Sequence, residues 1–393
     1  MANQSELKQE NVLRILKAIR KQGTASKPEI AKATDLTSVT AHNFINHLVE
    51  QEIVVETGYA KSHGGRKAVL YSMNPDYGYL MGVNLGRNII TICIYNINLE
   101  LLYSDRIDYQ QDYPDKIITM IVDEIDKAKT VTKLSTKDFL GIGITIPGQV
   151  THDTGTIINI TEMPSWNGIT LKEIIENSTG IPCFVDNDNN AAAMAIKWNN
   201  PSFENADLVC ITVGDGVGTG ILIDGKLFYG SHSNSGEFGH TTIDYDGPVC
   251  KCGNRGCIEA LISDYAIINN VKQAGFNDVS NIQEVVDLAK SGNQIIMDIL
   301  SEKGRLTGIA VEHIVKILDP DVIVIINSWI NEFPEMQYFI RDSVFFRCPL
   351  AKKNVLKILF NKIENLENIG PSALVLEKCF QLSYADLLLQ RAM

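Results

Sequence analysis

Apolar residues recur at helical spacing through the first fifty residues of the chain. In segment 11–23 they fall on one face of a helix that ends at Gly23, and they are Val12, Leu13, Ile15, Leu16 and Ile19. A short second helix is expected at "SKPEIAKAT", because Ser26 and Glu29 have capping-box spacing and Pro28 lies in the first turn. The pattern therefore predicts two helices separated by a tight turn.

A third helix is predicted within "DLTSVTAHNFINHLVEQEIV", with Thr37 as its N-cap. Its inward side chains are expected to be Ala41, Phe44, Ile45 and Leu48, and its outward polar side chains Ser38, Thr40, His42 and Asn43. Three helices joined by tight turns are typical of a helix-turn-helix. The last helix of that motif presents its N-terminal polar side chains to base edges in the major groove of DNA.

Two strand-like runs, "IVVETG" and "KAVLYSM", follow the third helix and flank the tip "YAKSHGGRK". A hairpin with a Gly-Gly tip and adjacent cations is typical of a wing, which would set Arg66 and Lys67 against phosphates or into a narrow minor groove. The alternative is a three-helix module that contacts protein, with a solvated polar face. The order of helix, turn, helix and basic hairpin favours double-stranded DNA.

The hydrophobic period changes after residue 75. Strand-like runs with turns at Gly86 and near Asn98 are followed by a helix over about 114–130 and the buried strand "FLGIGITIPG". Helix, strand and helix patterns continue to about residue 197, and a second such series starts at "ADLVCITVGDGVGTGILIDGKLFYG". This alternation predicts α/β architecture in a body of two lobes with a cleft between them.

The predicted organisation has three parts. Residues 1–75 form the DNA-binding head, residues 76–196 form the first lobe, and residues 197–369 form the second lobe. A C-terminal helix at about 370–393 is expected to pack back on the first lobe.

Composition and charge narrow the setting. The chain has 393 residues, of which 45% are hydrophobic and 21% charged, as in soluble globular proteins of two or three domains. Polar first residues and the lack of a long apolar run predict a cytoplasmic protein with no membrane association. Residues 1–75 hold ten Lys/Arg against seven Asp/Glu, whereas the whole chain has a net charge of −12. Only the head is suited to approach a polyanion.

The stretch "HTTIDYDGPVCKCGNRGC" holds three of the eight cysteines and one histidine. In a reducing cytosol such a cluster indicates metal binding or catalysis rather than a disulfide. His240, Cys250, Cys252 and Cys257 supply three thiolates and one imidazole, which suits a closed tetrahedral structural Zn²⁺ site. A redox pair would favour C-x-x-C at a helix start, and that pattern is absent.

The motifs "GGRK", "IPGQV", "VDNDNNAAA", "GDGVGTGILIDGKL", "SGEFGH" and "CKCGNRGCIE" occur in this order. Together they resemble the ROK family (repressors, uncharacterised frames and sugar kinases), and specifically its winged-helix repressors of the xylose-repressor type. The resemblance implies an actin/hexokinase-like two-lobed body with an N-terminal winged helix-turn-helix.

The resemblance also implies a set of sugar-binding residues, which are Asn187, Asp188, Glu237, His240 and Glu259. In the family the histidine faces the sugar through its second ring nitrogen, so a metal on the first would fix the ring. Two local alternatives remain for these positions. Asn187 and Asp188 could cap the helix that follows them, and Glu237 could cap a turn. The family's sugar loop reads differently at Thr161–Met163.

Kinases of the family carry an Asp-x-Gly-Gly-Thr turn for magnesium and phosphate, where this chain reads "NLGRN". Asn84 cannot supply the anionic metal ligand, and Arg87 adds bulk where backbone must approach phosphate. The adenosine-side loop reads "INSW", with Trp329 in place of a small glycine. The surviving "GDGVGTG" can keep its glycines for turn geometry alone.

These departures predict a non-enzymatic, sugar-responsive transcriptional repressor that senses a sugar or sugar phosphate. Two heads in a homodimer or homotetramer would bind a pseudo-palindromic operator. The competing interpretations are an ATP-dependent sugar kinase with a DNA-binding appendage, and a scaffold that binds a transport protein through the same body.

Overall fold

The computed structural model describes residues 4–61, 67–110, 113–349, 351, 356–361, 363 and 365–389. The chain forms two compact units. Unit 1 comprises residues 1–191 and 367–393, and unit 2 comprises residues 192–366. The intervening unit 2 is therefore an insertion between two sequence segments of unit 1. None of the helices in the described part of the chain is long and apolar enough to cross a bilayer.

The head at the start of unit 1 contains α1 (Gln4–Gln22), α2 (Lys27–Thr34) and α3 (Ser38–Glu50), followed by the hairpin of β2 (Val54–Tyr59) and β3 (Val69–Met73). The apolar face predicted for α1 is buried. The Ser26 backbone N–H and hydroxyl both donate to Glu29 Oε2, at 2.8 and 2.6 Å, which confirms the predicted capping box. The two-residue strand β1 (Ala25–Ser26) pairs with β3 and completes a winged helix.

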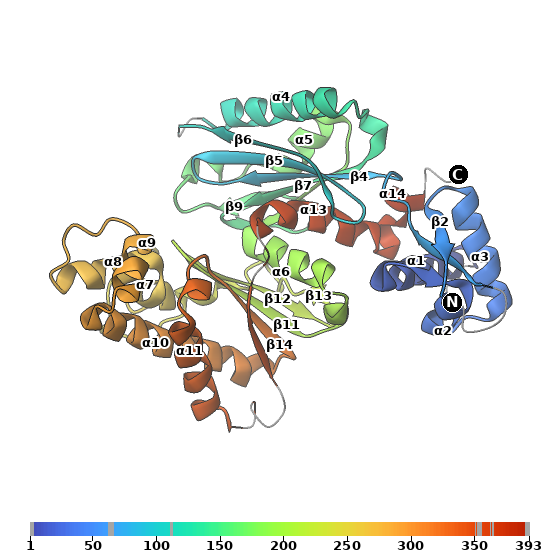
Figure 1. The fold of residues 1–393 in the computed structure, drawn as a ribbon. Helices are drawn as coiled ribbons and strands as arrows, with labels where there is room; N and C mark the ends of the chain where they lie inside the picture. Colours follow the sequence, from blue (N-terminus) through green and yellow to red (C-terminus); the bar gives the residue numbers. More distant parts are fainter. Residues whose placement is uncertain are drawn as a thin grey trace. The chain divides into compact units, whose positions relative to one another are not determined.

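The first lobe of unit 1 is built on a five-stranded sheet of order β10-β7-β4-β5-β6. Its strands are β4 (Tyr79–Leu85), β5 (Ile89–Asn96), β6 (Leu101–Asp108), β7 (Phe139–Ile146) and β10 (Cys183–Asn187). The first three form an antiparallel meander, and β7 and β10 run parallel to β4. Helices α4 (Pro114–Thr132) and α5 (Leu171–Thr179) cover one face of this sheet (Figure 1).

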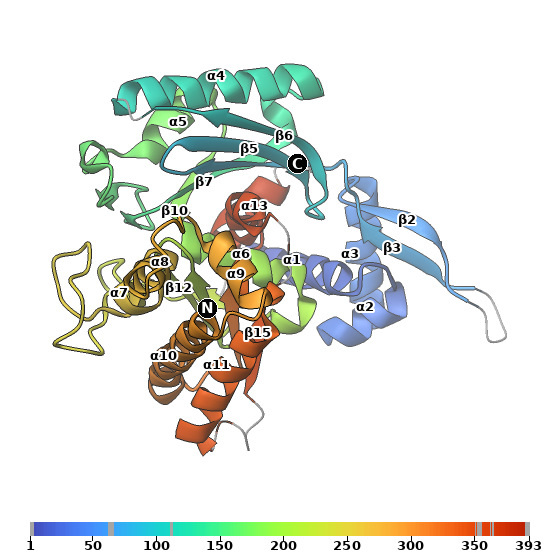
Figure 2. The same cartoon turned by 60° about the vertical axis from the view of Figure 1, so that its left-hand side comes forward.

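The other face of that sheet is covered by α13 (Leu366–Cys379), which comes from the end of the chain (Figure 2). Glycines make the close approach possible. A Cβ added at Gly143 would lie 1.8 Å from the Pro371 carbonyl oxygen, and one at Gly82 would lie 2.7 Å from Ser372 Oγ. The predicted segment of about 370–393 thus contains α13 and a separate α14 (Ala385–Leu389), with the short helix η6 (Leu382–Tyr384) between them.

Two hydrogen bonds join the head, the first lobe and the C-terminal segment within unit 1. The Arg20 guanidinium on α1 donates to the carbonyl oxygen of Ile97, in the turn after β5. Burial lowers the pKa of this guanidinium to about 10. The Tyr77 hydroxyl, between head and lobe, donates to the Leu388 carbonyl oxygen at 2.7 Å.

Unit 2 repeats the strand order of the first lobe. Its sheet runs β13-β12-β11-β14-β15, with a meander of β11 (Leu208–Val213), β12 (Val217–Ile223) and β13 (Lys226–Leu227), then the parallel strands β14 (Val322–Ile326) and β15 (Lys357–Phe360). One apolar core joins this sheet to helices from residues 258–347, which are α7 (Ile258–Ile262), α8 (Asp264–Gln273), α9 (Ile282–Lys290), α10 (Gln294–Leu318) and α11 (Pro334–Arg347). The α/β architecture predicted from the hydrophobic pattern is confirmed.

Candidate functional site

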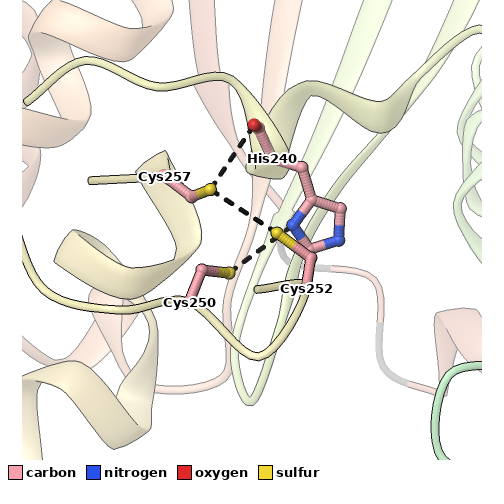
Figure 3. A group of neighbouring side chains, drawn as sticks. All are labelled: His240, Cys250, Cys252 and Cys257. Atoms are coloured by element: carbon pink, nitrogen blue, oxygen red, sulfur yellow. Dashed lines mark hydrogen bonds between the residues drawn. The ribbon is translucent and has the colours of Figure 1, made fainter. Parts of the chain in front are cut away.

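The three cysteines and the histidine of segment 240–257 converge in unit 2 (Figure 3). Their four candidate ligand atoms all lie within 4.8 Å of one another. Cys250 Sγ is 3.7 Å from His240 Nδ1, and Cys252 Sγ is 3.7 Å from Cys257 Sγ. Ligand atoms of a tetrahedral zinc ion, at about 2.3 Å for sulfur and 2.0–2.1 Å for nitrogen, lie about 3.5–3.8 Å apart. The donor set and its spacing therefore fit a four-coordinate metal.

The backbone explains why four residues spread over eighteen positions meet. His240 ends the short helix η4 (Glu237–His240), and Cys257 is the N-cap residue of α7. Between them the chain turns back, because the Cys250 N–H donates to the Asn254 carbonyl oxygen at 2.8 Å. Gly256 has a φ of +61°, and a Cβ there would lie 1.4 Å from the Asp244 carbonyl oxygen. Only glycine fits this position.

Glu259 joins the cysteine cluster to the glycine-rich turn between β11 and β12. Its side chain is buried, with Oε2 accepting a hydrogen bond from the Val217 N–H at 3.1 Å and Oε1 lying 3.8 Å from Cys250 Sγ. Glu237 is exposed, one turn before His240. The structure thus brings Glu259 and His240 to one cluster, through Cys250.

Asn187 and Asp188, the other two predicted sugar-binding residues, belong to unit 1. Asp188 is the first residue of α6 (Asp188–Asn199). Asn187 Oδ1 accepts from the Asn189 N–H at 2.8 Å, and Asn187 Nδ2 donates to the Gly148 carbonyl oxygen at 3.0 Å. This pair therefore has the helix-capping contacts that the sequence left open as an alternative. Asp188 is exposed.

The turn "NLGRN" between β4 and β5 contacts the loop that departs from the family pattern at 161–163. Arg87 forms an ion pair with Glu162. The Tyr109 hydroxyl donates to the Gly86 carbonyl oxygen at 2.5 Å and lies 3.7 Å from the Met163 sulfur. Arg87 and Glu162, which the sequence shows as two separate departures from the family pattern, are thus partners in one ion pair. Their opposite charges were the signal that could have revealed it.

The loop after β14 is filled by its own side chains. Trp329 is only 1% exposed, and its indole N–H donates to Asp264 Oδ1 at 2.9 Å. Burial raises the pKa of the Asp264 carboxyl. The Asp264 N–H in turn donates to the Gly214 carbonyl oxygen of the glycine-rich turn, at 2.8 Å. The indole therefore packs where the family's kinases carry glycine.

The predicted DNA-contacting side chains of α3 lie on its outer face. Ser38, His42 and Asn43 are exposed, and Thr40 is half-buried against the cap, because its hydroxyl is 2.8 Å from that of Thr37. Lys67 is exposed and lies just before β3, in the segment predicted as the tip of the wing, and Arg66 lies outside the described residues.

Sequence reasoning missed two partners of His42. Lys27 Nζ lies 3.3 Å from His42 Nδ1, and Asn46 Nδ2 lies 3.0 Å from His42 Nε2. Lys27 also stands 5.2 Å from the centroid of the Tyr71 ring. The ring of His42 is therefore held by neighbours on α2 and α3. The spacing of Asn46, four residues after His42, was the available signal.

Comparison with known proteins agrees with this architecture. The xylose repressor of Caldicellulosiruptor bescii is 32% identical over 381 residues, spanning 93% of this chain and 94% of the repressor. The xylose repressor of Bacillus subtilis is 27% identical and spans 96% and 97%. A crystal structure of a ROK family transcriptional regulator, described as a homologue of the E. coli MLC protein, superposes with a TM-score of 0.82 at 26% identity, covering 98% and 99%.

Solved structures of ROK family sugar kinases cover a smaller share of this chain. A ROK family glucokinase from Streptomyces griseus covers 76% of this chain and 99% of its own, with a TM-score of 0.64 at 24% identity. Fold and site together define a two-lobed, hexokinase-like α/β protein with a winged head. The ROK family model matches residues 80–346, and the chain belongs to the ROK family.

Proposed function

We propose that this protein is a sugar-responsive transcriptional repressor, which binds operator DNA through its head and senses a sugar or sugar phosphate in a degenerate kinase-like body. The observation that carries the proposal is the buried Trp329 indole in a chain that also has a winged head. The pairing of Arg87 with Glu162 supports it. Relatives that match over the whole length, head included, are named repressors.

The DNA contacts are assigned to Ser38, Thr40, His42 and Asn43 of α3 and to Arg66 and Lys67 of the wing. Exposed polar side chains on a helix of this motif suit base edges, and wing cations suit phosphates. We infer a homodimer or homotetramer, because two-fold related heads match a pseudo-palindromic operator. The protein then acts in the cytoplasm, where the operator lies. The division into residues 1–75, 76–196 and 197–369 follows these roles.

The effector contacts are assigned to Asn187, Asp188, Glu237, His240 and Glu259. Carboxylates and amides accept and donate to the hydroxyls of a sugar. With Nδ1 of His240 facing the cysteine sulfurs, its Nε2 is the nitrogen left for a ligand. D-xylose is the first effector to test, since relatives of 32% and 27% identity are named xylose repressors.

The metal is assigned as structural Zn²⁺, held by His240, Cys250, Cys252 and Cys257. Three sulfurs and one nitrogen at tetrahedral spacing favour zinc and leave no open position for chemistry. The metal would cross-link η4, the 250–254 turn and the start of α7. That cross-link orients the imidazole whose other nitrogen we assign to the sugar.

The test measures operator binding by the full chain. A duplex that the protein binds is first selected from a random-sequence pool, and binding to it is then measured by fluorescence anisotropy. Affinity should fall steeply with salt, and Lys67→Ala should weaken binding and reduce the salt slope by about 1. Lys290→Ala, which changes a surface lysine of α9 paired with Glu332, is the control and should bind normally. Sugars that raise the thermal midpoint should change the operator Kd by about 5–150-fold. A chain that selects no duplex is not a repressor.

A further inference from the structure

Val39, the second residue of α3, exposes an aliphatic side chain in the middle of a polar surface. It is 71% exposed, whereas the other apolar positions of α3 turn inward, with Ala41 and Ile45 buried. Ser38 precedes it, and His42 and Asn43 lie three and four positions further on, which places all four on one helical face. The apolar side chain thus lies on the face assigned to base edges.

The first turn of α3 holds this side chain in a fixed position. Thr37 Oγ1 accepts a hydrogen bond from the Thr40 N–H at 3.2 Å, which closes the N-cap around Val39. A β-branched residue in a helix has one strongly preferred rotamer. Valine is also a weak helix former, so helix propensity does not explain its presence here. The isopropyl group is therefore presented rigidly and costs little further ordering on contact.

In the major groove, thymine is the base that offers an apolar group, its C5-methyl. The same base pair shows the N6 and N7 of adenine, which suit a bidentate amide. Asn43 supplies that amide one turn from Val39, whereas His42 is already held by Lys27 and Asn46. The face therefore combines an apolar contact with an adenine-reading group.

We infer that Val39 determines operator specificity by packing on the C5-methyl group of one thymine in each half-site. This assignment rests on the proposed DNA-binding function and adds to it the chemical feature that the head reads. The neighbouring Asn43 binds the adenine of that pair or of an adjacent one. Replacing the thymine methyl with hydrogen should then have the same effect as shortening Val39.

The test uses the full-length protein and its selected operator. Each half-site thymine is replaced in turn, symmetrically, with deoxyuridine, which lacks only the methyl group. At one position the wild type should bind about fourfold more weakly per half-site, the effect of one buried methyl group. Val39→Ala should bind the thymine operator more weakly and should not respond to deoxyuridine at that position. Leu7→Ala, which shortens a 49% exposed leucine on α1, is the control and should behave as wild type.

Two results would overturn the assignment while leaving the repressor proposal in place. One is equal wild-type affinity for every deoxyuridine operator. The other is a Val39→Ala protein that keeps the full deoxyuridine effect, since another side chain would then read the methyl group. Failure to select any duplex would overturn the DNA-binding role and this assignment with it.

Discussion

Two single side chains, Arg87 and Trp329, occupy the turns that the family resemblance matches with the nucleotide loops of the kinases. Trp329 buries its whole indole and satisfies its N–H with Asp264, so the loop after β14 is stable without a ligand. In the other lobe, Arg87 is neutralised by Glu162 rather than by phosphate. Both side chains therefore make contacts within the protein.

The nucleotide prediction belongs to these residues. The wild-type protein should show no sugar-dependent ATP turnover, because Arg87 is paired with Glu162 in one turn and the buried Trp329 indole fills the other. A coupled assay with magnesium-ATP and a panel of hexoses and pentoses measures it. Turnover of about 1 per second, within the ordinary range of kinases, would favour the kinase alternative.

Whether a contact between two residues can be predicted from the sequence depends on how many positions separate them along the chain. The clustering of His240, Cys250, Cys252 and Cys257 could be predicted, because residue types and spacing of this kind are typical of a metal site. The pairing of Arg87 with Glu162 could not, since 75 positions separate the two residues. Likewise Glu259 was expected to face a sugar, and its hydrogen bond from Val217 required the fold.

At the scale of elements, the segment between η4 and α7 is short, and its backbone conformation is fixed by hydrogen bonds and by close packing. Its backbone hydrogen bonds include those from the Cys250 N–H to the Asn254 carbonyl oxygen at 2.8 Å and from the Gly256 N–H to the Pro248 carbonyl oxygen at 2.9 Å, and Gly256 admits no side chain. Burial raises the pKa of the Cys250 thiol to about 12, so without a metal that sulfur stays protonated at neutral pH. Metal binding would thus contribute directly to the order of this segment.

Cys252→Ser should therefore change two properties together. Elemental analysis should find close to one zinc per chain in the wild type and little in the variant, and the variant should also lose its effector response. Operator binding should persist, because the head has its own core in α1–α3.

The matched control for that experiment is Cys348→Ser, which changes a cysteine at the end of α11, outside the cluster. It should keep both the metal and the sugar response. If the wild type binds sugar normally while fully reduced and metal-free, the proposed link from metal to His240 to ligand is wrong.

Elements with a strong periodic pattern or a cap were predictable, and short ones were not. The apolar face of α1 and the Thr37 cap of α3 are local properties that the sequence states directly. The strand β1 has two residues and exists only because β3 lies beside it. The interruption between α13 and α14 also escaped the pattern.

At the scale of the whole molecule, the head is attached to the first lobe by more than a linker. The guanidinium of Arg20 is buried and donates a hydrogen bond to the carbonyl oxygen of Ile97, in the turn between β5 and β6 of the first-lobe sheet. The Tyr77 hydroxyl, in the segment between the head and the first lobe, donates a hydrogen bond to the Leu388 carbonyl oxygen of α14. A change in the first lobe can therefore reach the DNA-binding helices through fixed contacts.

Arg20→Ala should loosen the head without unfolding it. Chymotrypsin cleavage near Tyr77 and Tyr79 should become about 10- to 150-fold faster, because a hydrogen bond from a charged donor contributes about 1.5–3 kcal/mol and cleavage follows the open population. The effector should also change operator affinity less. Arg14→Ala, which removes an exposed cation of the same helix, is the control. Equal cleavage rates for the two variants would show that Arg20 does not hold the head.

At this scale the sequence predicted the classes of the parts and a C-terminal helix at about 370–393 that packs back on the first lobe, but not the contacts that hold this helix there. Hydrophobic period alone indicated a head and two α/β series. The close approach of Pro371 to Gly143, which holds the C-terminal segment against the first-lobe sheet, is a contact that no local pattern encodes. The identical strand order of the two sheets likewise arises from pairing between distant segments.

The packing of α13 against Gly82 and Gly143 also determines when the first lobe can finish folding during translation. The last strand of the first-lobe sheet, β10, ends at Asn187, about 180 residues before α13 begins at Leu366. At about 5–20 residues per second, roughly 9–36 s pass before the helix that covers one face of this sheet is synthesised. The lobe translated before unit 2 is thus completed by a helix translated after it. A chain that terminates before α13 carries a head but no finished sensor lobe to control it.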